Sequence, residues 1–509
     1  MATNPKGKVY LIGAGPGDAG LLTIKGKRCL EKAEVVVYDR LVNPALLAYA
    51  PREAERIYAG KAPHRHAMLQ EEINALLVEK ARAGKIVARL KGGDPFIFGR
   101  GGEEALALAE AGIPFEVVPG VTSAVAAPAY AGIPVTHRGL ASTVTFITGN
   151  EDPQKEQSEI DWQAIAQNKG TLVFLMGMAN LGAIADKLVA YGRPPETPVT
   201  LIRWGTRAEQ ETLSGTLADI ESRAKKTGFS NPAVILVGEV TRLREELAWA
   251  EKRPLFGRRI VITRPRQQAQ AMAEMVEDLG GEALIFPVIR TLPPLTWEPL
   301  DQALRNLQQY DWAIFTSANG VNFFFDRLKN LGLDVRRFYG VRLAAIGPAT
   351  AAALEERGLI PDFQPAEYRA EAIAAGLAGR VDGKKVLLPR ADIARPLLAE
   401  ELRRAGAEVT EVAAYRTVPA GEDMQGLKEM LAEGKIAAVT FTSSSTVKNL
   451  LHALGPEARD LLARTALACI GPVTAATARE AGLKVAVTAQ EYTVPGLVAA
   501  LTRYFGGEK

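Results

Sequence analysis

The sequence predicts an α/β fold throughout, arranged in several lobes. Short apolar runs of strand length alternate with helix-like runs from residue 8 onward. Glycine-rich turns follow several of these strands, as in open sheets that bind ligands at the carboxyl ends of their strands. The chain has 509 residues, 47% of them apolar and 23% charged. This is ordinary globular composition and enough chain for about two to four domains.

Composition also excludes several classes of protein. A net charge of +3 argues against bulk nucleic-acid binding. Cys29 and Cys469 lie far apart with no paired spacing, which predicts reduced thiols in a cytoplasmic protein. The pair His64 and His66 flanks an arginine, so we expect a solvated loop and no metal site. The N-terminus lacks an apolar signal core and no run reaches transmembrane length, so no membrane partner is expected.

The first strand, residues 8–12, enters a loop that begins like a dinucleotide fingerprint. Asp18 stands where the third glycine of Gly-x-Gly-x-x-Gly belongs. A carboxylate there would repel a pyrophosphate, and Pro16 removes a backbone donor. We therefore reject a nicotinamide cofactor. A helix is predicted over 21–33, followed by a strand over 35–38 that ends at Asp39.

The most informative stretch is residues 89–104, Arg-Leu-Lys-Gly-Gly-Asp-Pro-Phe-Ile-Phe-Gly-Arg-Gly-Gly-Glu-Glu. A strand over 85–90 precedes it and a helix-like run over 103–110 follows. Gly92 and Gly93 leave room for a ligand to touch the main chain, and Asp94 adds a carboxylate. The alternative is a plain turn between strand and helix, but the stretch holds more glycine than a turn requires.

The rest of the first half continues the alternation. A charged run over 151–160 predicts a linker between a lobe of about 1–150 and a second α/β lobe of about 160–245. Residues 253–257 form the expected boundary with the second half. Strands are predicted at 115–118, 144–148, 171–176, 199–202 and 233–237, and helices at 124–131, 181–191 and 241–249.

From about residue 258 the sequence repeats itself. Ile-Val-Ile-Thr-Arg at 260–264 returns as Val-Leu-Leu-Pro-Arg at 386–390, an offset of about 125 residues. Phe-Thr-Ser and Ile-Gly-Pro-x-Thr blocks return at nearly the same offset. We predict two similar lobes around a cleft, one of about 258–290 plus 418–509 and the other of about 291–417.

Each repeated block ends a strand with hydroxyl or small residues. Such positions either cap a helix or bind an anion, and the sequence favours neither. One repeat position is asymmetric, because Ile289 aligns with Tyr415. The phenol hydroxyl either forms a hydrogen bond within the protein at a lobe junction or points into the cleft.

Five blocks in the first half resemble the tetrapyrrole methylase family, in particular uroporphyrinogen-III C-methyltransferase. They are Gly-Ala-Gly-Pro-Gly-Asp at 13–18, Tyr-Asp-Arg-Leu-Val at 38–42, the stretch 90–103, Val-Pro-Gly-Val-Thr-Ser at 118–123 and Gly-Ile-Pro-Val-Thr-His-Arg at 132–138. The second half is similar to uroporphyrinogen-III synthase in its duplicated blocks and in Tyr-Arg-Thr at 415–417. The resemblance implies a two-lobed methylase fold over 1–252 and a two-lobed, internally duplicated flavodoxin-like synthase fold over 258–509.

The methylase resemblance implies S-adenosylmethionine as methyl donor, bound between the lobes, with no metal. Asp39 matches the family's proposed proton acceptor and Lys61 its proposed donor, although Lys61 by itself suggests a solvated lysine. Ser123 departs slightly from the family pattern, which often has alanine there. The implied cofactor contacts are Pro16, Gly92, Gly93, Asp94, Ile97, Thr122, Ser123, Met176 and Gly205.

The substrates implied by both families carry many carboxylates. Arg40, Arg100 and Arg138 are candidates to bind them, and ordinary surface charge explains each equally well. In the synthase half Tyr415 matches the tyrosine proposed to assist loss of water. The implied carboxylate-binding residues there are Thr350, Ser443, Ser444 and Thr474.

The expected function is therefore bifunctional: closure of hydroxymethylbilane to uroporphyrinogen III, then two methylations to precorrin-2. One alternative is a working methylase joined to a mere tetrapyrrole-binding module. Another is a methylase of a later corrin intermediate. A two-lobed solute-binding protein would need a signal peptide, and a trifunctional sirohaem synthase would need a preceding NAD domain. The family implies a homodimer through the methylase half. The sequence leaves the sirohaem or cobalamin destination open.

Overall fold

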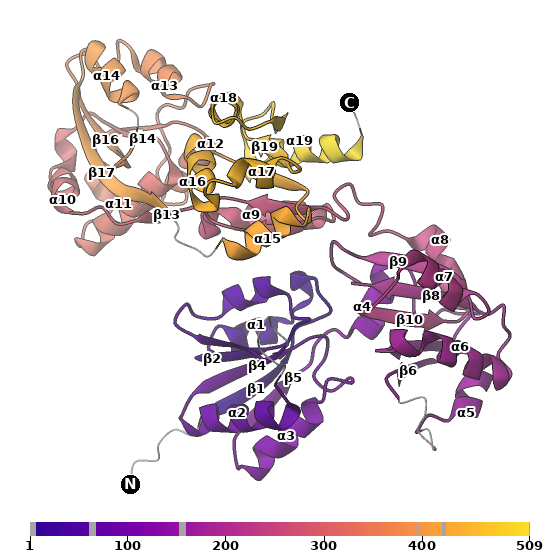
Figure 1. Ribbon diagram of the computed structural model, residues 1–509. Helices are drawn as coiled ribbons and strands as arrows, with labels where there is room; N and C mark the ends of the chain where they lie inside the picture. Colours follow the sequence, from indigo (N-terminus) through magenta and orange to yellow (C-terminus); the bar gives the residue numbers. More distant parts are fainter. Residues whose placement is uncertain (1–6, 61–67, 152–158, 395, 420–423, 508–509) are drawn as a thin grey trace, which may run out of the picture.

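The computed structural model describes residues 7–60, 68–151, 159–394, 396–419 and 424–507 (Figure 1). These residues form four five-stranded sheets, each flanked by helices. No helix among them is both long and apolar enough to cross a lipid bilayer.

Sheet one is parallel throughout, in the order β3-β2-β4-β1-β5. The inner strands β1, β2 and β4 are mostly apolar because helices cover both faces. Ile12 and Tyr38 both lie beside Leu90, so the carboxyl ends of neighbouring strands meet at one edge. The strands are β1 Lys8–Gly13, β2 Val35–Tyr38, β3 Glu55–Tyr58, β4 Ile86–Lys91 and β5 Phe115–Val118, and the helices α1 Ile24–Leu30, α2 Gln70–Arg82 and α3 Gly101–Glu110.

Sheet two has the order β6-β7-β10-β8-β9 and is antiparallel except for the pair β6 and β7. Its core buries Phe174 and Leu201 beneath the surrounding helices. The strands are β6 Val144–Thr148, β7 Thr171–Leu175, β8 Pro198–Arg203, β9 Glu211–Thr216 and β10 Ala233–Val237. The helices are α4 Ser123–Tyr130, α5 Trp162–Gln167, α6 Leu181–Ala190, α7 Ile220–Thr227 and α8 Arg244–Leu247.

The first lobe ends earlier than the expected residue 150. β6 pairs with β7 in sheet two, and α4 packs Ala124 and Ala127 against Val173 and Val234 of that sheet. The chain therefore passes between lobes before α4. The charged run that suggested a linker falls between β6 and α5, inside the second lobe, and residues 152–158 of it lie outside the described residues.

Sheet three has the order β12-β11-β18-β19-β20 and is parallel throughout. Counted along the lobe, this is the strand order 2-1-3-4-5 of flavodoxin-like folds, as predicted. The strands are β11 Arg259–Ile262, β12 Glu282–Ile285, β18 Ala438–Phe441, β19 Ala466–Cys469 and β20 Val485–Thr488. The helices are α9 Arg266–Asp278, α15 Gln425–Ala432, α16 Ser444–Leu454, α17 Ala458–Leu462, α18 Pro472–Glu480 and α19 Val494–Gly506.

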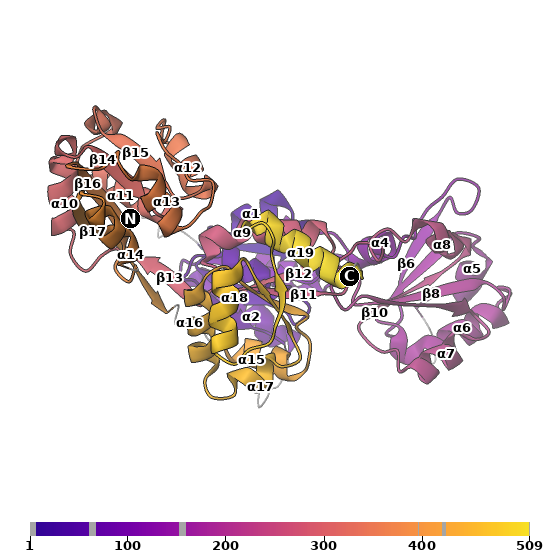
Figure 2. The same cartoon turned by 90° about the horizontal axis from the view of Figure 1, so that it is seen from above.

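Sheet four has the order β13-β17-β16-β14-β15. Its four parallel strands repeat the pattern of sheet three, and β13 is added at the edge beside β17. β13 pairs antiparallel with the long β17, and the two run from this lobe toward the neighbouring one (Figure 2). The strands are β13 Ile289–Leu292, β14 Trp312–Phe315, β15 Arg342–Ala345, β16 Lys385–Ala391 and β17 Glu408–Pro419. The helices are α10 Glu298–Arg305, α11 Ala318–Asn330, α12 Pro348–Glu355, α13 Ala370–Leu377 and α14 Leu397–Arg404.

The junction between the two halves is packed. Leu255, in the expected linker, is fully buried in the core beneath α9 and α19. Arg259 of β11 forms ion pairs with Glu209 of the first half and with Glu282 of β12. Burial of an apolar side chain and a shared cation both hold the halves together. The exact boundary between the two halves stays a prediction.

Candidate active sites

Three glycine-bearing loops meet at the carboxyl edge of sheet one. Gly93 donates its N–H to the carbonyl of Gly15 at 2.7 Å, and Gly15 returns a bond at 3.2 Å. A Cβ on Gly120 would lie 2.3 Å from the Gly93 carbonyl oxygen and 2.6 Å from the Gly13 Cα. No side chain fits between these backbones, which explains why glycine recurs here.

Asp94 fastens two of these loops together. Its carboxylate accepts the backbone N–H of Phe96 at 2.8 Å and that of Gly120 at 2.9 Å. Gly92 lies against the turn that follows Asp39, because a Cβ on it would meet Leu41 at 3.2 Å. Asp94 therefore shapes the site, and direct contact with a cofactor stays a prediction.

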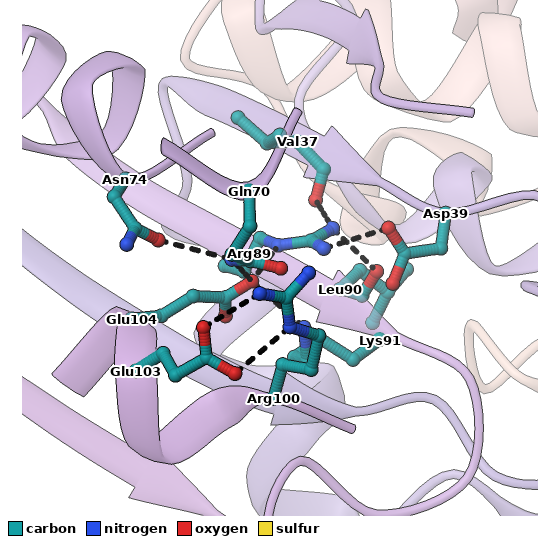
Figure 3. Close-up of polar contacts among 10 residues, drawn as sticks. All are labelled: Val37, Asp39, Gln70, Asn74, Arg89, Leu90, Lys91, Arg100, Glu103 and Glu104. Atoms are coloured by element: carbon teal, nitrogen blue, oxygen red, sulfur yellow. Dashed lines mark hydrogen bonds and ion pairs between the residues drawn. The ribbon is translucent and has the colours of Figure 1, made fainter. Parts of the chain in front are cut away.

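A buried ion network lies below the loop (Figure 3). Arg89 of β4 is 2% exposed; its guanidinium donates to Asp39 at 2.6 Å and to Glu104 at 3.0 Å. Lys91 Nζ lies 2.7 Å from the same Glu104 oxygen, and Gln70 donates to it at 3.2 Å. Arg89 and Lys91 share one face of β4 because strand side chains alternate. The network thus joins both ends of the stretch 89–104 and holds one oxygen of Asp39.

The network is electrostatically balanced, with two cations and two carboxylates. Burial lowers the pKa of Lys91, and nearby Arg89 lowers it further. For Arg89, burial opposes the charge, but Asp39 and Glu104 outweigh it and the pKa is raised. The side chain of Asp39 is 33% exposed, so its carboxylate is both oriented and reachable.

Helix α4 brings the second lobe to this edge. Thr122 caps the helix by accepting from the Ala124 N–H at 3.3 Å. Asp18 accepts from the Tyr130 hydroxyl at 2.6 Å and donates its N–H to Thr206 at 3.0 Å. A Cβ on Gly205 would lie 2.4 Å from the Ala127 Cβ, so this loop touches the helix.

Most of the predicted cofactor residues lie on these loops. Gly93 lies close to Thr122 and Ser123, since its Cβ would stand 3.8 and 3.9 Å from their backbone atoms. Ile97 is partly exposed on the loop after Asp94. Met176 follows β7 with a φ of 59° and is exposed, but no described contact joins it to the first lobe. Of the predicted cofactor residues, one group lies near this edge: Pro16, Gly92, Gly93, Asp94, Thr122 and Ser123. Gly205 follows β8 and packs against α4.

The predicted substrate arginines differ in their surroundings. All three are exposed, and Arg100 is also paired with Glu103 at 2.7 Å. Sequence reasoning missed Arg207 of the second lobe. Its guanidinium donates a 2.5 Å hydrogen bond to the carbonyl of Leu41 in the first lobe. Lys61 lies outside the described residues, shortly after β3 ends.

In the second half Tyr415 is buried, with its hydroxyl 3.0 Å from the Ser317 hydroxyl. Ser317 also caps α11 by accepting from the Gly320 N–H at 3.0 Å. Phe323 stacks on the phenol ring at 5.6 Å between centroids. Burial raises the pKa of Tyr415, so the phenol keeps its proton at neutral pH. Ser317 belongs to the repeated Phe-Thr-Ser block, and that repeat is the sequence feature that could have identified it.

The predicted carboxylate-binding hydroxyls begin helices, as expected for either of their two roles. Ser443 caps α16 and shares a 2.9 Å hydrogen bond with Ser445. Ser444 bonds Thr477 at 2.7 Å. Thr350 and Thr474 are 3% and 5% exposed in the first turns of α12 and α18. Substrate contact by these four residues stays a prediction.

Comparison with known proteins covers both halves. The family model of tetrapyrrole (corrin/porphyrin) methylases matches residues 8–221, and that of uroporphyrinogen-III synthase HemD matches residues 270–499. A porphyrin biosynthesis protein HemD of Ruminiclostridium josui is 40% identical over 98% of this chain and 99% of that protein. The chain belongs to this family of fused tetrapyrrole methylases and uroporphyrinogen-III synthases.

Two further methylases match the first half, and one of them also matches part of the second. A uroporphyrinogen-III C-methyltransferase of Bacillus subtilis is 44% identical over 70% of this chain and 74% of that protein. The crystal structure of a uroporphyrin-III C-methyltransferase of Thermus thermophilus, complexed with S-adenyl homocysteine, is 41% identical. It covers 47% of this chain and 94% of that chain with a TM-score of 0.40. Among the residues described for this fused chain, no group of three or more His, Cys, Asp or Glu side chains is placed to hold a metal ion.

Proposed function

We propose that the chain is a bifunctional enzyme of tetrapyrrole synthesis. The second half closes hydroxymethylbilane to uroporphyrinogen III, with inversion of ring D and loss of water. The first half then transfers two methyl groups to give precorrin-2. The observation that carries the proposal is the presence of both families, in tandem, along a chain that a HemD relative matches over 98% of its length.

The glycine edge of sheet one fits S-adenosylmethionine. A Cβ on Gly93 would meet nothing nearer than 3.8 Å, so the backbone there is open to a ligand. Gly92, Gly93, Thr122 and Ser123 would hold the cofactor through main-chain groups, and Asp94 would keep their loops in place. Carboxylates at Asp18 and Asp94 suit a cationic cofactor better than a phosphate. When bound, this cofactor supplies an electrophilic methyl group.

Asp39 is the residue we assign to proton transfer. A pyrrole carbon that gains a methyl becomes part of a cationic ring, and a nearby carboxylate stabilises that charge or accepts the proton. Arg89 holds one oxygen of Asp39 at 2.6 Å from the buried side. Holding the reactants in line can supply about 7–11 kcal/mol of the acceleration. The rigid glycine edge supports such positioning.

Tyr415 is the residue we assign to loss of water in the synthase half. Its raised pKa keeps the phenol protonated, and Ser317 fixes the hydroxyl. The phenol then donates its proton to the leaving hydroxyl group. The pyrrole nitrogens drive most of this departure, so we expect the tyrosine to help without being indispensable.

The proposal also includes a cytoplasmic location and a homodimer through the methylase half. Two buried, unpaired cysteines support a reducing compartment. Phe96 and Phe98 expose 55% and 42% of their surface, which a second copy would cover. Light scattering of the full chain tests the dimer.

The test of function supplies hydroxymethylbilane and S-adenosylmethionine together to the purified chain. We expect precorrin-2 from the single protein. Formation of uroporphyrinogen I alone, by spontaneous closure, would show that the synthase assignment is wrong. Uroporphyrinogen III without methylated product would refute the methylase assignment.

A further inference from the structure

The two synthase lobes place an arginine at equivalent positions with different surroundings. Arg390 lies at the end of β16, and its guanidinium lies 2.9 Å from Glu411 of β17. Arg264 follows β11 in the other lobe. Among the described side chains, no carboxylate lies within ion-pair distance of Arg264.

Strand register explains the difference. In sheet four Leu388 of β16 lies beside Glu411 of β17. The equivalent pair in sheet three is Ile262 of β11 beside Ile285 of β12. An isoleucine therefore stands where the other lobe has the glutamate that neutralises its arginine.

The guanidinium of Arg264 is poorly satisfied as a result. One terminal nitrogen donates to Gln268 at 3.2 Å, and Nε is buried with no hydrogen-bond partner. Burial lowers the pKa of both Arg264 and Arg390, but Glu411 opposes the shift at Arg390 and no carboxylate of the described residues opposes it at Arg264. Arg264 is half-buried and has a buried Nε without a partner in the described part of the chain, which is costly to a fold, so an anion from outside the chain would satisfy it.

The position of Arg264 suits such an anion. β11 lies beside β18, whose end leads into Ser443 and the N-terminus of α16. Backbone N–H groups and the helix dipole make that end favourable for a carboxylate. Gln268 of α9 also donates to Asn319 at 2.7 Å, so Arg264 lies where α9 meets the first turn of α11 in the other lobe.

We propose that Arg264 binds a carboxylate side chain of the linear tetrapyrrole at the junction of the two synthase lobes. The proposal rests on the synthase function above and names a residue of its substrate site. Arg390, neutralised by Glu411, has a structural role at the equivalent position. The duplicated fold thereby acquires one lobe with a free cation for the substrate.

The test measures uroporphyrinogen III formation by the full chain carrying R264Q, R264K or R390Q. R264Q raises the KM for hydroxymethylbilane about tenfold to hundredfold, which is the loss of one charge-assisted hydrogen bond. R264K, which keeps the charge, raises KM less. R390Q leaves KM unchanged but lowers the unfolding temperature. R264Q does not lower that temperature, because it removes an uncompensated charge.

Methylation of supplied uroporphyrinogen III stays at the wild-type rate in all three variants and verifies that the chain is intact. An unchanged KM in R264Q would overturn the proposal. So would a fall in unfolding temperature with only kcat reduced, because that is the pattern of a structural residue. If the wild-type chain itself forms no uroporphyrinogen III, the synthase function fails and the carboxylate site fails with it.

Discussion

Replacing Glu104 by glutamine tests whether the buried ion network stabilises the first lobe. The substitution keeps the size of the side chain but leaves Arg89 and Lys91 with only Asp39 as counter-charge. Breaking a buried ion pair on one side costs about 3–5 kcal/mol. Lys91 can relieve the imbalance by releasing its proton. At pH 7, deprotonating a lysine of ordinary pKa costs about 5 kcal/mol. The loss in free energy of unfolding therefore does not exceed this amount.

A domain of this size loses about 2–4 °C of unfolding temperature per kcal/mol, so E104Q should lower the transition of the methylase half by about 6–20 °C. Calorimetry of the full chain measures the shift, and hydrogen exchange in peptides from β2 and β4 assigns it to the lobe. The matched control is E103Q, the adjacent residue in an exposed pair with Arg100, which should unfold like the wild type.

The pH dependence gives a second readout of the same variant. Burial lowers the pKa of Lys91 in the folded state, so the unfolded chain binds more protons between the two pKa values. Stability therefore rises with pH in that window. Glu104 raises the pKa of Lys91, so its loss in E104Q lowers that pKa further, whereas E103Q leaves it unchanged. The deficit of E104Q relative to E103Q should therefore be smaller at pH 9 than at pH 7. Equal unfolding temperatures for E104Q and E103Q would refute the reasoning.

Three further predictions concern the reactions. D39N should lower kcat for methyl transfer by about 10²- to 10⁴-fold, with a much smaller change in cofactor affinity. Transfer of a radiolabelled methyl group measures kcat, and an unchanged value would exclude proton transfer by Asp39. Y415F should lower the synthase rate by about 10²-fold and leave measurable activity. Because burial raises the pKa of Tyr415, the wild-type rate should show no loss from phenol ionisation below pH 10. G120A should abolish S-adenosylmethionine binding in calorimetric titration while the synthase stays active, because its Cβ would lie 2.3 Å from the Gly93 oxygen; normal binding would show that the loops can separate.

Local sequence pattern predicted much of the fold. Apolar runs between glycine turns matched β1, β2, β4 and β5 because parallel strands buried on both faces carry their signal in composition. The passage between lobes was misplaced because α4 is a helix of small residues. Its alanines show nothing of which sheet they pack against until the tertiary structure is known.

The candidate site was less accessible to sequence. Arg89 and Lys91 alternate within an apolar strand, and that pattern indicates buried charges that need partners. Their partners are Asp39, which directly follows a neighbouring strand, and Glu104 of the following helix, so only three-dimensional proximity identifies them. The asymmetry between Arg264 and Arg390 likewise depends on strand register. Ile285 in sheet three occupies the position that Glu411 occupies in sheet four.

The arrangement of sheets three and four imposes an order on folding during synthesis. β11 lies between β12 and β18, and the whole of sheet four is encoded between those two neighbours. A nascent chain that ends at residue 419 can complete sheet four, whereas β11 and β12 still present an unpaired edge. Domains fold as the ribosome releases them, so the inserted lobe matures before the lobe that surrounds it. Until β18 emerges, the open edge of β11 is available for pairing with another molecule.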